Sequence, residues 1–391
     1  MTTWNDELNR LSLEGMRRSL LTIENGQGPE VEIDGQLKLL LCSNNYLGLA
    51  DHPALVAASI VATRQYGVGS GASRLVSGTL RPHQEFEERL AAFKGTQSAL
   101  LFNSGYAANT GVLQGLFGPN DLIFSDSLNH ASIIDGCKLS KARVLVYPHN
   151  DMDCLEALMH QERSTRKGRW VIVTDGVFSM DGDFAVLPKL CELKERFEAL
   201  LMVDDAHGTG AWGDKGRGLG EHFGCLDKID LHMGTLGKAL GCSGAYLAAD
   251  RDIIDVLINR SRSFIFSTSL PPSVPASAIS AIELVEGSEG HKLRQKLHQN
   301  RKVFTKCLID GGIDILGSPS QIVPIITGEP KPTMLITQRL FQKGIFLQGI
   351  RPPTVPAGKC RLRATLMASH LPDELIKAAQ QILTVVREVL G

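Results

Sequence analysis

The chain has 391 residues, of which 43% are hydrophobic and 21% charged, and its formal net charge at pH 7 is −1. This length exceeds one ordinary hydrophobic core and predicts two domains, or a large domain with a smaller one. The near-neutral charge argues against binding to nucleic acid or an anionic membrane, and no apolar stretch has the length of a transmembrane helix.

The cysteines are spread along the chain without a C-x-x-C pair. They are Cys42, Cys137, Cys154, Cys191, Cys225, Cys242, Cys307 and Cys360. This spacing is typical of neither a zinc cluster nor a disulfide framework, so we expect no metal and a reducing, cytoplasmic location. The N-terminal residues mix charged and apolar side chains at helical spacing and lack the apolar core of a signal peptide.

Residues 1–48 are predicted to form an N-terminal arm. Within the arm, the stretch VEIDGQLKLLLC indicates a short hairpin, because the Asp-Gly pair at 34–35 is a typical turn between two strands. Beyond the arm, Phe86 and Phe93 lie on one face of a predicted helix. We expect this helix to end at Gly95, since glycine adopts the left-handed conformation without strain.

Residues 49–288 are predicted to form a large α/β domain. Six short apolar runs, four of which contain β-branched residues, indicate strands, and segments long enough for crossover helices separate them. The runs cover residues 99–102, 122–124, 144–147, 171–174, 201–203 and 231–233. Because strands alternate with helices, the sequence predicts a mostly parallel sheet.

Residues 289–391 break this pattern and are predicted to form a smaller α+β domain. After a charged helical stretch, three segments have the composition of strands: QIVPIITG, GIFLQGI and CRLRATL. Leu375, Ile382 and Val386 then recur at the spacing of an amphipathic helix that closes the chain.

Ligands of a parallel sheet bind beyond the carboxyl ends of its strands, so the residues after each predicted strand are candidates for a site. Ser104, Gly105 and Tyr106 follow the first of these strands and begin a helix, whose free backbone N–H groups can bind phosphate. His130 follows the second strand. Small-residue turns and single histidines are also common where no ligand binds, so neither signal decides alone.

Two more turns bring reactive side chains to the same edge. Asp204 ends a strand and His207 follows it; burying a carboxylate there costs several kcal/mol unless a cation meets it. Thr235 and Lys238 follow the next strand among glycines. Taken by itself, Lys238 could equally be an ordinary surface lysine. Together with the phosphate candidate, these groups favour pyridoxal phosphate (PLP), because a lysine forms a Schiff base with its aldehyde and a carboxylate keeps its ring nitrogen protonated.

Ordered motifs along nearly the whole chain carry a family resemblance. They are SNNYLGL, GSGASRLVSGT, NSGYAAN, NHAS, TDGVFSMDGD, VDDAHGTG, GRGLGE, TLGKALGCSGA, FSTSLPP and RPPTVPAGKCRLRATLMASH. With these motifs the chain resembles the α-oxoamine synthases, which condense an amino acid with an acyl-coenzyme A thioester and release carbon dioxide. The resemblance implies the PLP-dependent transferase fold of type I, with a mostly parallel central sheet in the large domain and a smaller α+β C-terminal domain.

The resemblance also implies roles around the cofactor. Lys238 would carry PLP and remove the α-proton of the substrate, and Asp204 would face the pyridine nitrogen. His207 would face the phenolic oxygen with Ser179 nearby, and His130 would stack on the ring. The groups implied to bind the phosphate are Ser104, Gly105, Tyr106 and Thr235, joined by Ser267 and Thr268 from the neighbouring subunit of a homodimer.

For the substrates, the resemblance implies that Arg363 pairs with the amino-acid carboxylate and that Arg351 assists, since a planar guanidinium suits bidentate carboxylate binding. Arginines on strands also form surface ion pairs, and that alternative stays open here. The further substrate contacts that the resemblance implies are Asn44, Ser73 and Thr354.

The stretch RPPTVP favours the branch of the family that joins L-alanine to pimeloyl-coenzyme A in biotin biosynthesis. A branch that uses glycine and acetyl-coenzyme A is the alternative, and an ordinary aminotransferase is a more distant one. Thr22 stands where the biotin branch often has an arginine, which leaves the acyl chain and its carrier open. Glycines at 67, 69 and 71 mimic a dinucleotide-binding motif only loosely, so we interpret them as a flexible loop over the substrate.

Overall fold

The computed structural model describes residues 3–391, which cluster into two compact units. The smaller unit comprises the residues up to Gly48, the short segment Met180–Asp183 and Gln295–Gly391. The larger unit comprises Leu49–Ser179 and Phe184–Arg294. The domain boundaries predicted from the sequence, after residues 48 and 288, stay a prediction.

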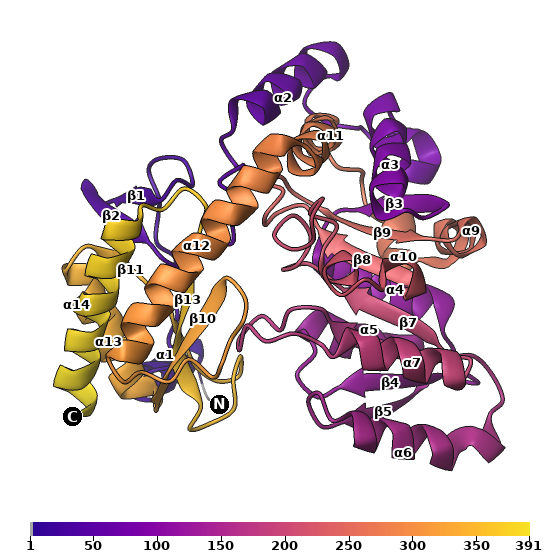
Figure 1. Ribbon diagram of the computed structural model, residues 1–391. Helices are drawn as coiled ribbons and strands as arrows, with labels where there is room; N and C mark the ends of the chain where they lie inside the picture. Colours follow the sequence, from indigo (N-terminus) through magenta and orange to yellow (C-terminus); the bar gives the residue numbers. More distant parts are fainter. Residues whose placement is uncertain (1–2) are drawn as a thin grey trace. The chain divides into compact units, whose positions relative to one another are not determined.

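A seven-stranded sheet forms the centre of the larger unit (Figure 1). In spatial order its strands are β3 (Ser98–Phe102), β9 (Ala245–Ala249), β8 (Leu231–Thr235), β7 (Leu200–Asp204), β6 (Trp170–Asp175), β4 (Leu122–Asp126) and β5 (Arg143–Tyr147). The six predicted strands are confirmed, and the sheet is mostly parallel. Only β9 runs antiparallel to its neighbours β3 and β8. It was not predicted, because three of its five residues are alanine, which is depleted in strands.

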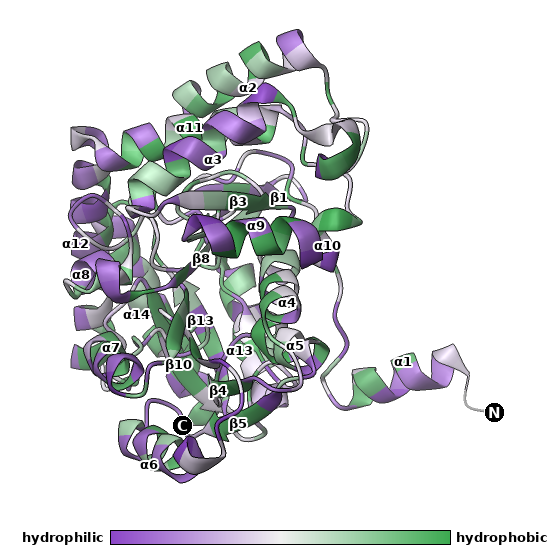
Figure 2. Cartoon of the chain, turned by 90° about the vertical axis from the view of Figure 1, so that its right-hand side faces the viewer, coloured by the Kyte–Doolittle hydropathy of each residue, from purple (hydrophilic) through white to green (hydrophobic). Residues whose placement is uncertain are grey.

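Ten α-helices surround this sheet. They are α2 (Pro53–Tyr66), α3 (Arg81–Lys94), α4 (Gly105–Leu116), α5 (Ala131–Ser140), α6 (Met152–Glu162), α7 (Leu187–Arg196), α8 (Leu219–His222), α9 (Arg251–Arg260), α10 (Arg262–Ile265) and α11 (Ser273–Glu286). The predicted helix is α3, which ends as expected at Gly95 with φ +74°. Helices such as α3 and α9 carry both hydrophilic and hydrophobic residues, as Figure 2 shows. Their apolar sides pack on strands β3 and β9.

Helix α4 lies against α5 at the centre of the hydrophobic core. Gly136 of α5 permits this close approach, since a Cβ there would lie 2.8 Å from the Asn109 carbonyl oxygen and 2.9 Å from Leu113 Cδ1. The two helices begin directly after β3 and after the loop that follows β4, so their packing fixes the positions of their N-terminal residues. The distance between the backbones of α4 and α5 therefore determines where their N-terminal residues lie at the edge of the sheet.

Two three-stranded sheets and four helices make up the smaller unit. One sheet has the order β1 (Glu30–Ile33), β2 (Gln36–Leu40) and β11 (Ile345–Phe346), and the other β10 (Ile322–Gly328), β13 (Cys360–Thr365) and β12 (Gly349–Ile350). The helices are α1 (Trp4–Leu13), α13 (Pro330–Gln342), α14 (Pro372–Leu390) and most of α12 (Ser288–Asp310). The hairpin is confirmed, with φ values of +51° and +69° at Asp34 and Gly35.

The segment GIFLQGI differs from its prediction as one strand. Its first part, β11, pairs in parallel with β2, whereas its second part, β12, pairs antiparallel with β13. Two residues, Leu347 and Gln348, separate the parts, so the chain changes sheets within the segment. A run of apolar residues does not reveal such a change, because both parts are extended.

Among the helices of residues 3–391, none is both long and apolar enough to cross a membrane.

Replacement of Gly136 by valine should destabilise the protein by about 1–3 kcal/mol, because the added side chain must push α5 away from α4. Urea unfolding followed by circular dichroism would measure the free energy of unfolding. Gly118→Ala is the control, since a Cβ there meets nothing within 4 Å. Equal stability of the Gly136 variant and the wild type would contradict the packing argument.

Candidate active site

The carboxyl ends of β3, β4, β6, β7 and β8 lie at one edge of the central sheet, as the sheet order requires. Register places Asp175, the last residue of β6, beside Asp204, the last residue of β7. Asp204 in turn lies beside Met233 of β8, two residues before Thr235. The predicted residues that follow these strands are thereby brought to one edge, which is where open α/β sheets bind ligands.

Asp204 is only 4% exposed, and its carboxylate is held by neutral groups. Asn109 Nδ2 donates to Oδ2 at 2.7 Å, and the backbone N–H of Ala206 donates to Oδ1 at 3.0 Å. Neither of these two donors carries a charge. A protonated nitrogen on a ligand would complete this arrangement, because a buried carboxylate is most stable beside a cation.

His130 caps the N-terminus of α5 and is connected to Asp204 through two side chains. Its Nδ1 accepts the Ser132 N–H at 3.2 Å and lies 2.7 Å from Ser132 Oγ. Ser132 Oγ accepts a hydrogen bond of 2.9 Å from Asn109, the same amide that binds Asp204. Partial burial lowers the pKa of His130 below its ordinary value, as does the charge of Lys238, while Asp204 opposes the shift. The hydrogen bond from the Ser132 N–H makes Nδ1 an acceptor and leaves Nε2 as the other ring nitrogen.

Asp175 is a third member of this group and was not predicted as a site residue. Its Oδ2 accepts the backbone N–H of His130 at 2.7 Å, which fixes the start of α5. Burial raises the pKa of Asp175 well above its usual range, and the charge of Asp204 raises it further. The signal that could have found it is its position, because Asp175 ends β6 as Asp204 ends β7.

Asn109 and Ser132 were likewise not predicted. Both lie inside motifs quoted for the family resemblance, NSGYAAN and NHAS, but their side chains belong to helices rather than to strand ends. Asn109 Oδ1 is buried without a hydrogen-bond partner, so this oxygen could still accept a hydrogen bond.

The N-terminus of α4 has the features of an anion site. Ser104 is its N-cap, with Oγ accepting the Ala107 N–H at 3.1 Å. A Cβ at Gly105 would lie 2.8 Å from Thr235 Cγ2, so only glycine fits where α4 meets the end of β8. Thr235 Oγ1 is buried without a hydrogen-bond partner. The Tyr106 hydroxyl donates to Asp135. The group that Tyr106 offers to an anion at the N-terminus of α4 is therefore its backbone N–H.

Lys238 follows β8 in a tight turn and is partly exposed. Its carbonyl oxygen accepts the Gly241 N–H at 2.9 Å, and the Leu236 N–H donates to the Gly244 carbonyl at 2.9 Å. Gly241 has φ +65°, and a Cβ there would lie 2.5 Å from the Leu49 carbonyl carbon. The turn is thus rigid, and it brings the charge of Lys238 close enough to lower the pKa of His130.

Ser73 and Thr268 lie side by side in the larger unit, joined by an isolated β-bridge. The neighbouring Ser269 N–H donates to the Ala72 carbonyl at 3.0 Å, and Asn103 Nδ2 donates to the Thr268 carbonyl at 2.7 Å. Asn103 directly follows β3, so the 267–269 segment is tied to the end of that strand. Of the other predicted residues, His207 is buried in the turn after β7, and Ser179 ends the first segment of the larger unit.

The predicted substrate residues of the smaller unit form two groups. Arg363, on β13, donates from Nη1 to Asn44 Oδ1 at 3.3 Å and is only 7% exposed. Arg351 donates from Nη2 to the Arg17 carbonyl at 2.7 Å, and its carbonyl accepts the Thr354 N–H at 3.1 Å.

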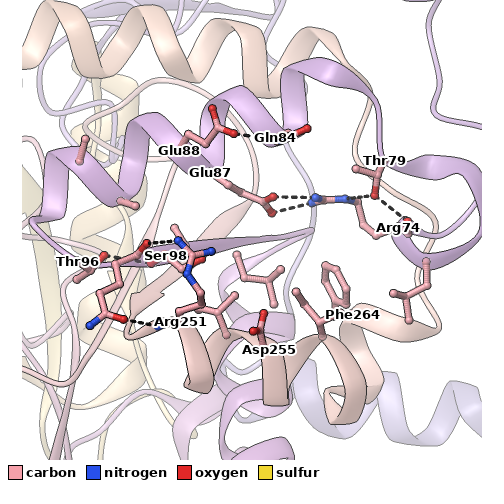
Figure 3. Close-up of a pocket in the computed structure, with 18 residues that line it drawn as sticks. Arg74, Thr79, Gln84, Glu87, Glu88, Thr96, Ser98, Arg251, Asp255 and Phe264 are labelled. Atoms are coloured by element: carbon pink, nitrogen blue, oxygen red, sulfur yellow. Dashed lines mark hydrogen bonds and ion pairs between the residues drawn. The ribbon is translucent and has the colours of Figure 1, made fainter.

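A cavity of about 690 Å³ lies between α3 and α9, at the amino end of β3 (Figure 3). Arg74 forms two hydrogen bonds of 2.8 Å to Glu87 there and a third, of 2.9 Å, to Thr79 Oγ1. None of the predicted site residues lines this cavity. Because its charged pair is already neutralised and it lies away from the carboxyl edge, we assign the site to the edge.

Comparison with known proteins agrees with this geometry. Residues 37–382 match the aminotransferase class I and II family, and the chain belongs to that family.

Within the family, the chain is 56% identical over 383 residues to the 8-amino-7-oxononanoate synthase of Geobacter sulfurreducens, covering 98% of this chain and 97% of that protein. Structures of serine palmitoyltransferase, one with a PLP internal aldimine, have a TM-score of 0.91 at 30% identity and cover 98% of this chain and 96% of that chain. The crystal structure of 8-amino-7-oxononanoate synthase from Francisella tularensis has a TM-score of 0.76 at 28% identity, covering 90% and 99%. The expected fold of type I PLP transferases is confirmed.

The pKa of His130 should lie below 6.5 in the cofactor-free protein, as NMR titration after histidine-selective isotope labelling would measure. Lys238→Ala should raise this pKa, because it removes a positive charge that disfavours the imidazolium. Asp204→Asn should lower it further, because it removes the charge that favours the imidazolium. Lys189→Ala, which removes a partly exposed lysine of α7, is the control. An unchanged His130 pKa in Lys238→Ala would show that Lys238 does not lie near His130.

Proposed function

We propose that the chain is a PLP-dependent acyltransferase that condenses L-alanine with pimeloyl-coenzyme A, giving 8-amino-7-oxononanoate, coenzyme A and carbon dioxide, a step of biotin biosynthesis. The name shared by its relatives supports the reaction, since the Geobacter sulfurreducens protein is 56% identical over almost the full length. The match to serine palmitoyltransferase structures that contain PLP supports the cofactor.

One observation carries the assignment of the cofactor to the sheet edge. The buried carboxylate of Asp204 has two neutral donors, and Thr235 Oγ1, at the end of the adjacent strand β8, is buried without a partner. A ligand with a protonated ring nitrogen and a phosphate would satisfy both. The glycine at 105 leaves room beside Thr235 where any side chain would collide. The residues present therefore fit PLP.

When bound, PLP supplies an electron sink for the α-carbon of the amino acid. Asp204 keeps the ring nitrogen protonated, and the Asn109 amide holds the carboxylate in place. The N-terminus of α4 and Thr235 bind the phosphate through N–H and O–H donors. Lys238 holds the cofactor and removes the α-proton with its amine. His130, whose Nδ1 accepts the Ser132 N–H, would hold the ring and would donate from Nε2 toward the thioester oxygen.

The remaining cofactor roles rest on the motif resemblance. His207, in the turn after Asp204, faces the phenolic oxygen, with Ser179 nearby. Ser267 and Thr268 reach the phosphate of the neighbouring subunit in a homodimer. The bridge between Thr268 and Ser73 supports a shared role for these two segments, because whatever moves one displaces the other.

Arg363 binds the carboxylate of the amino acid, supported by its burial and by its hydrogen bond to Asn44. A planar guanidinium suits bidentate binding of such a carboxylate. Arg351 and Thr354 contact the substrates beside it. Cysteine usage supports a cytoplasmic location for the enzyme.

The test is thiol release by the purified, PLP-loaded protein with L-alanine, glycine or serine against pimeloyl-, acetyl- or long-chain acyl-coenzyme A. We expect release with L-alanine and pimeloyl-coenzyme A, and none from Lys238→Ala, which lacks the amine that moves the α-proton. Release only with glycine and acetyl-coenzyme A would assign the protein to the glycine-using branch. Formation of a keto acid without thiol release would assign an aminotransferase instead.

Arg363→Ala should raise the KM for L-alanine by about 10- to 150-fold, since a charge-assisted hydrogen bond contributes about 1.5–3 kcal/mol. The KM for the thioester should change far less, because the thioester has no α-carboxylate to pair. Steady-state kinetics with each substrate varied separately would measure both constants. The matched control is Arg339→Ala, which removes a half-exposed arginine paired with Glu388. Equal increases in both constants would reject the proposed contact.

A further inference from the structure

Lys94 is a lysine buried at a place that the proposed reaction does not use. It is the last residue of α3, its residue exposure is 2%, and neither PLP nor a substrate has been assigned to it. Lysine is rarely buried without a partner, because removing its ammonium from water is costly. The position therefore calls for a specific role.

The Lys94 ammonium binds both ends of one loop. Nζ donates to Thr209 Oγ1 at 2.9 Å and to the Arg217 carbonyl at 2.6 Å. It also lies 3.7 Å from Asp205 Oδ2. Thr209 stands near the start of the loop that follows β7, and Arg217 near its end. A single charge thus closes the loop that carries His207.

Asp205 completes the closure from inside the loop. Its Oδ2 accepts hydrogen bonds from Thr209 Oγ1 at 3.1 Å and from the Leu219 N–H at 3.2 Å. A Cβ at Gly208 would lie 1.9 Å from Asp205 Oδ1, and one at Gly218 would lie 1.5 Å from Oδ2. The backbone therefore wraps directly around this carboxylate. Because Asp204 precedes Asp205 in the chain, the wrapping also restrains Asp204.

Tyr246 extends the same cluster into the sheet. Its hydroxyl lies 2.9 Å from Thr209 Oγ1. A Cβ at Gly234 of β8 would lie 2.3 Å from this hydroxyl, so the tyrosine packs against the backbone immediately before Thr235. The cluster thus touches both turns that carry predicted cofactor residues.

We propose that Lys94, paired with Asp205, is a positioning residue that holds the turn bearing Asp204 and His207 in its cofactor-binding geometry. The inference rests on the proposed function, since it concerns the binding of PLP at that turn. Burial raises the pKa of Asp205 to about 6, and Lys94 opposes this shift. Without Lys94 the buried carboxylate would lack a cation, and the wrapped backbone would have to rearrange around it.

The experiment titrates the cofactor-free full-length protein with PLP and compares Lys94→Met with the wild type. We expect the dissociation constant of PLP to rise about tenfold, within the range of couplings between neighbouring residues. The visible absorption maximum of the bound cofactor should shift as well, because the groups facing it have moved. Lys189→Met, which removes an exposed ion pair with Glu192, is the matched control and should leave both unchanged.

Two further variants separate positioning from mere stability. Lys94→Met combined with Asp205→Asn also removes the unpaired carboxylate, so its dissociation constant for PLP should fall part of the way back toward the wild-type value. The hydrogen bonds from Nζ to Thr209 and Arg217 remain lost. Tyr246→Phe removes one hydroxyl from the cluster, so it should raise the constant by about threefold even if Lys94→Met fails to fold.

A wild-type dissociation constant and spectrum in Lys94→Met, or in Tyr246→Phe where Lys94→Met does not fold, would overturn the inference. So would a double variant that regains the melting temperature without regaining affinity for PLP. If the wild type itself does not bind PLP, the proposed function fails, which the same titration reveals before any variant is compared.

Discussion

The burial of negative charge at the carboxyl edge of the central sheet is the constraint on which the larger unit's site depends. Asp126, Asp175 and Asp204 end the three adjacent strands β4, β6 and β7, and all three are buried. Parallel pairing brings these strand ends to one edge, where ionised carboxylates repel one another. Each carboxylate therefore needs stabilising contacts of its own. Asp126 accepts backbone N–H groups from Leu128 and Asn150, at 2.8 and 2.9 Å. Asp175 has a strongly raised pKa, and Asp204 is held by neutral donors.

The sequence predicts most of the fold of the larger unit because its strands are continuous apolar runs, which buried parallel strands require. The strand β9 was not predicted. It follows β8 directly and pairs with it antiparallel, so it does not fit the alternation of strands and crossover helices on which the prediction relied. In the smaller unit, the division of GIFLQGI between two sheets depends on pairing partners far away in sequence, β2 and β13. Local patterns contain no information about such partners.

The candidate site was predictable where chemistry follows a strand end, as at Asp204 and Lys238. The residues that support these groups were not, because Asn109, Ser132 and Lys94 act through contacts with residues 23 to 115 positions away in the chain. Asparagine and serine within helices carry no distinctive spacing, and a lysine at a helix C-terminus is an ordinary surface residue in most proteins. Only the packing of helices on the sheet brings them to their partners.

The surroundings of Asp175, Asp204 and Asp205 differ, and this difference decides which carboxylate can bind a ligand. Burial and the charge of Asp204 raise the pKa of Asp175, and Asp205 already has Lys94 within 4 Å. Asp204 combines burial with two neutral donors, so a protonated ring nitrogen about 4 Å away would gain roughly 4 kcal/mol at an effective dielectric constant of 20. That energy is realised only if Asp204 does not move toward another partner. The Asn109 amide on one side and the wrapped turn of Asp205 on the other prevent such a movement, which links the rigidity of the turn to the strength of cofactor binding.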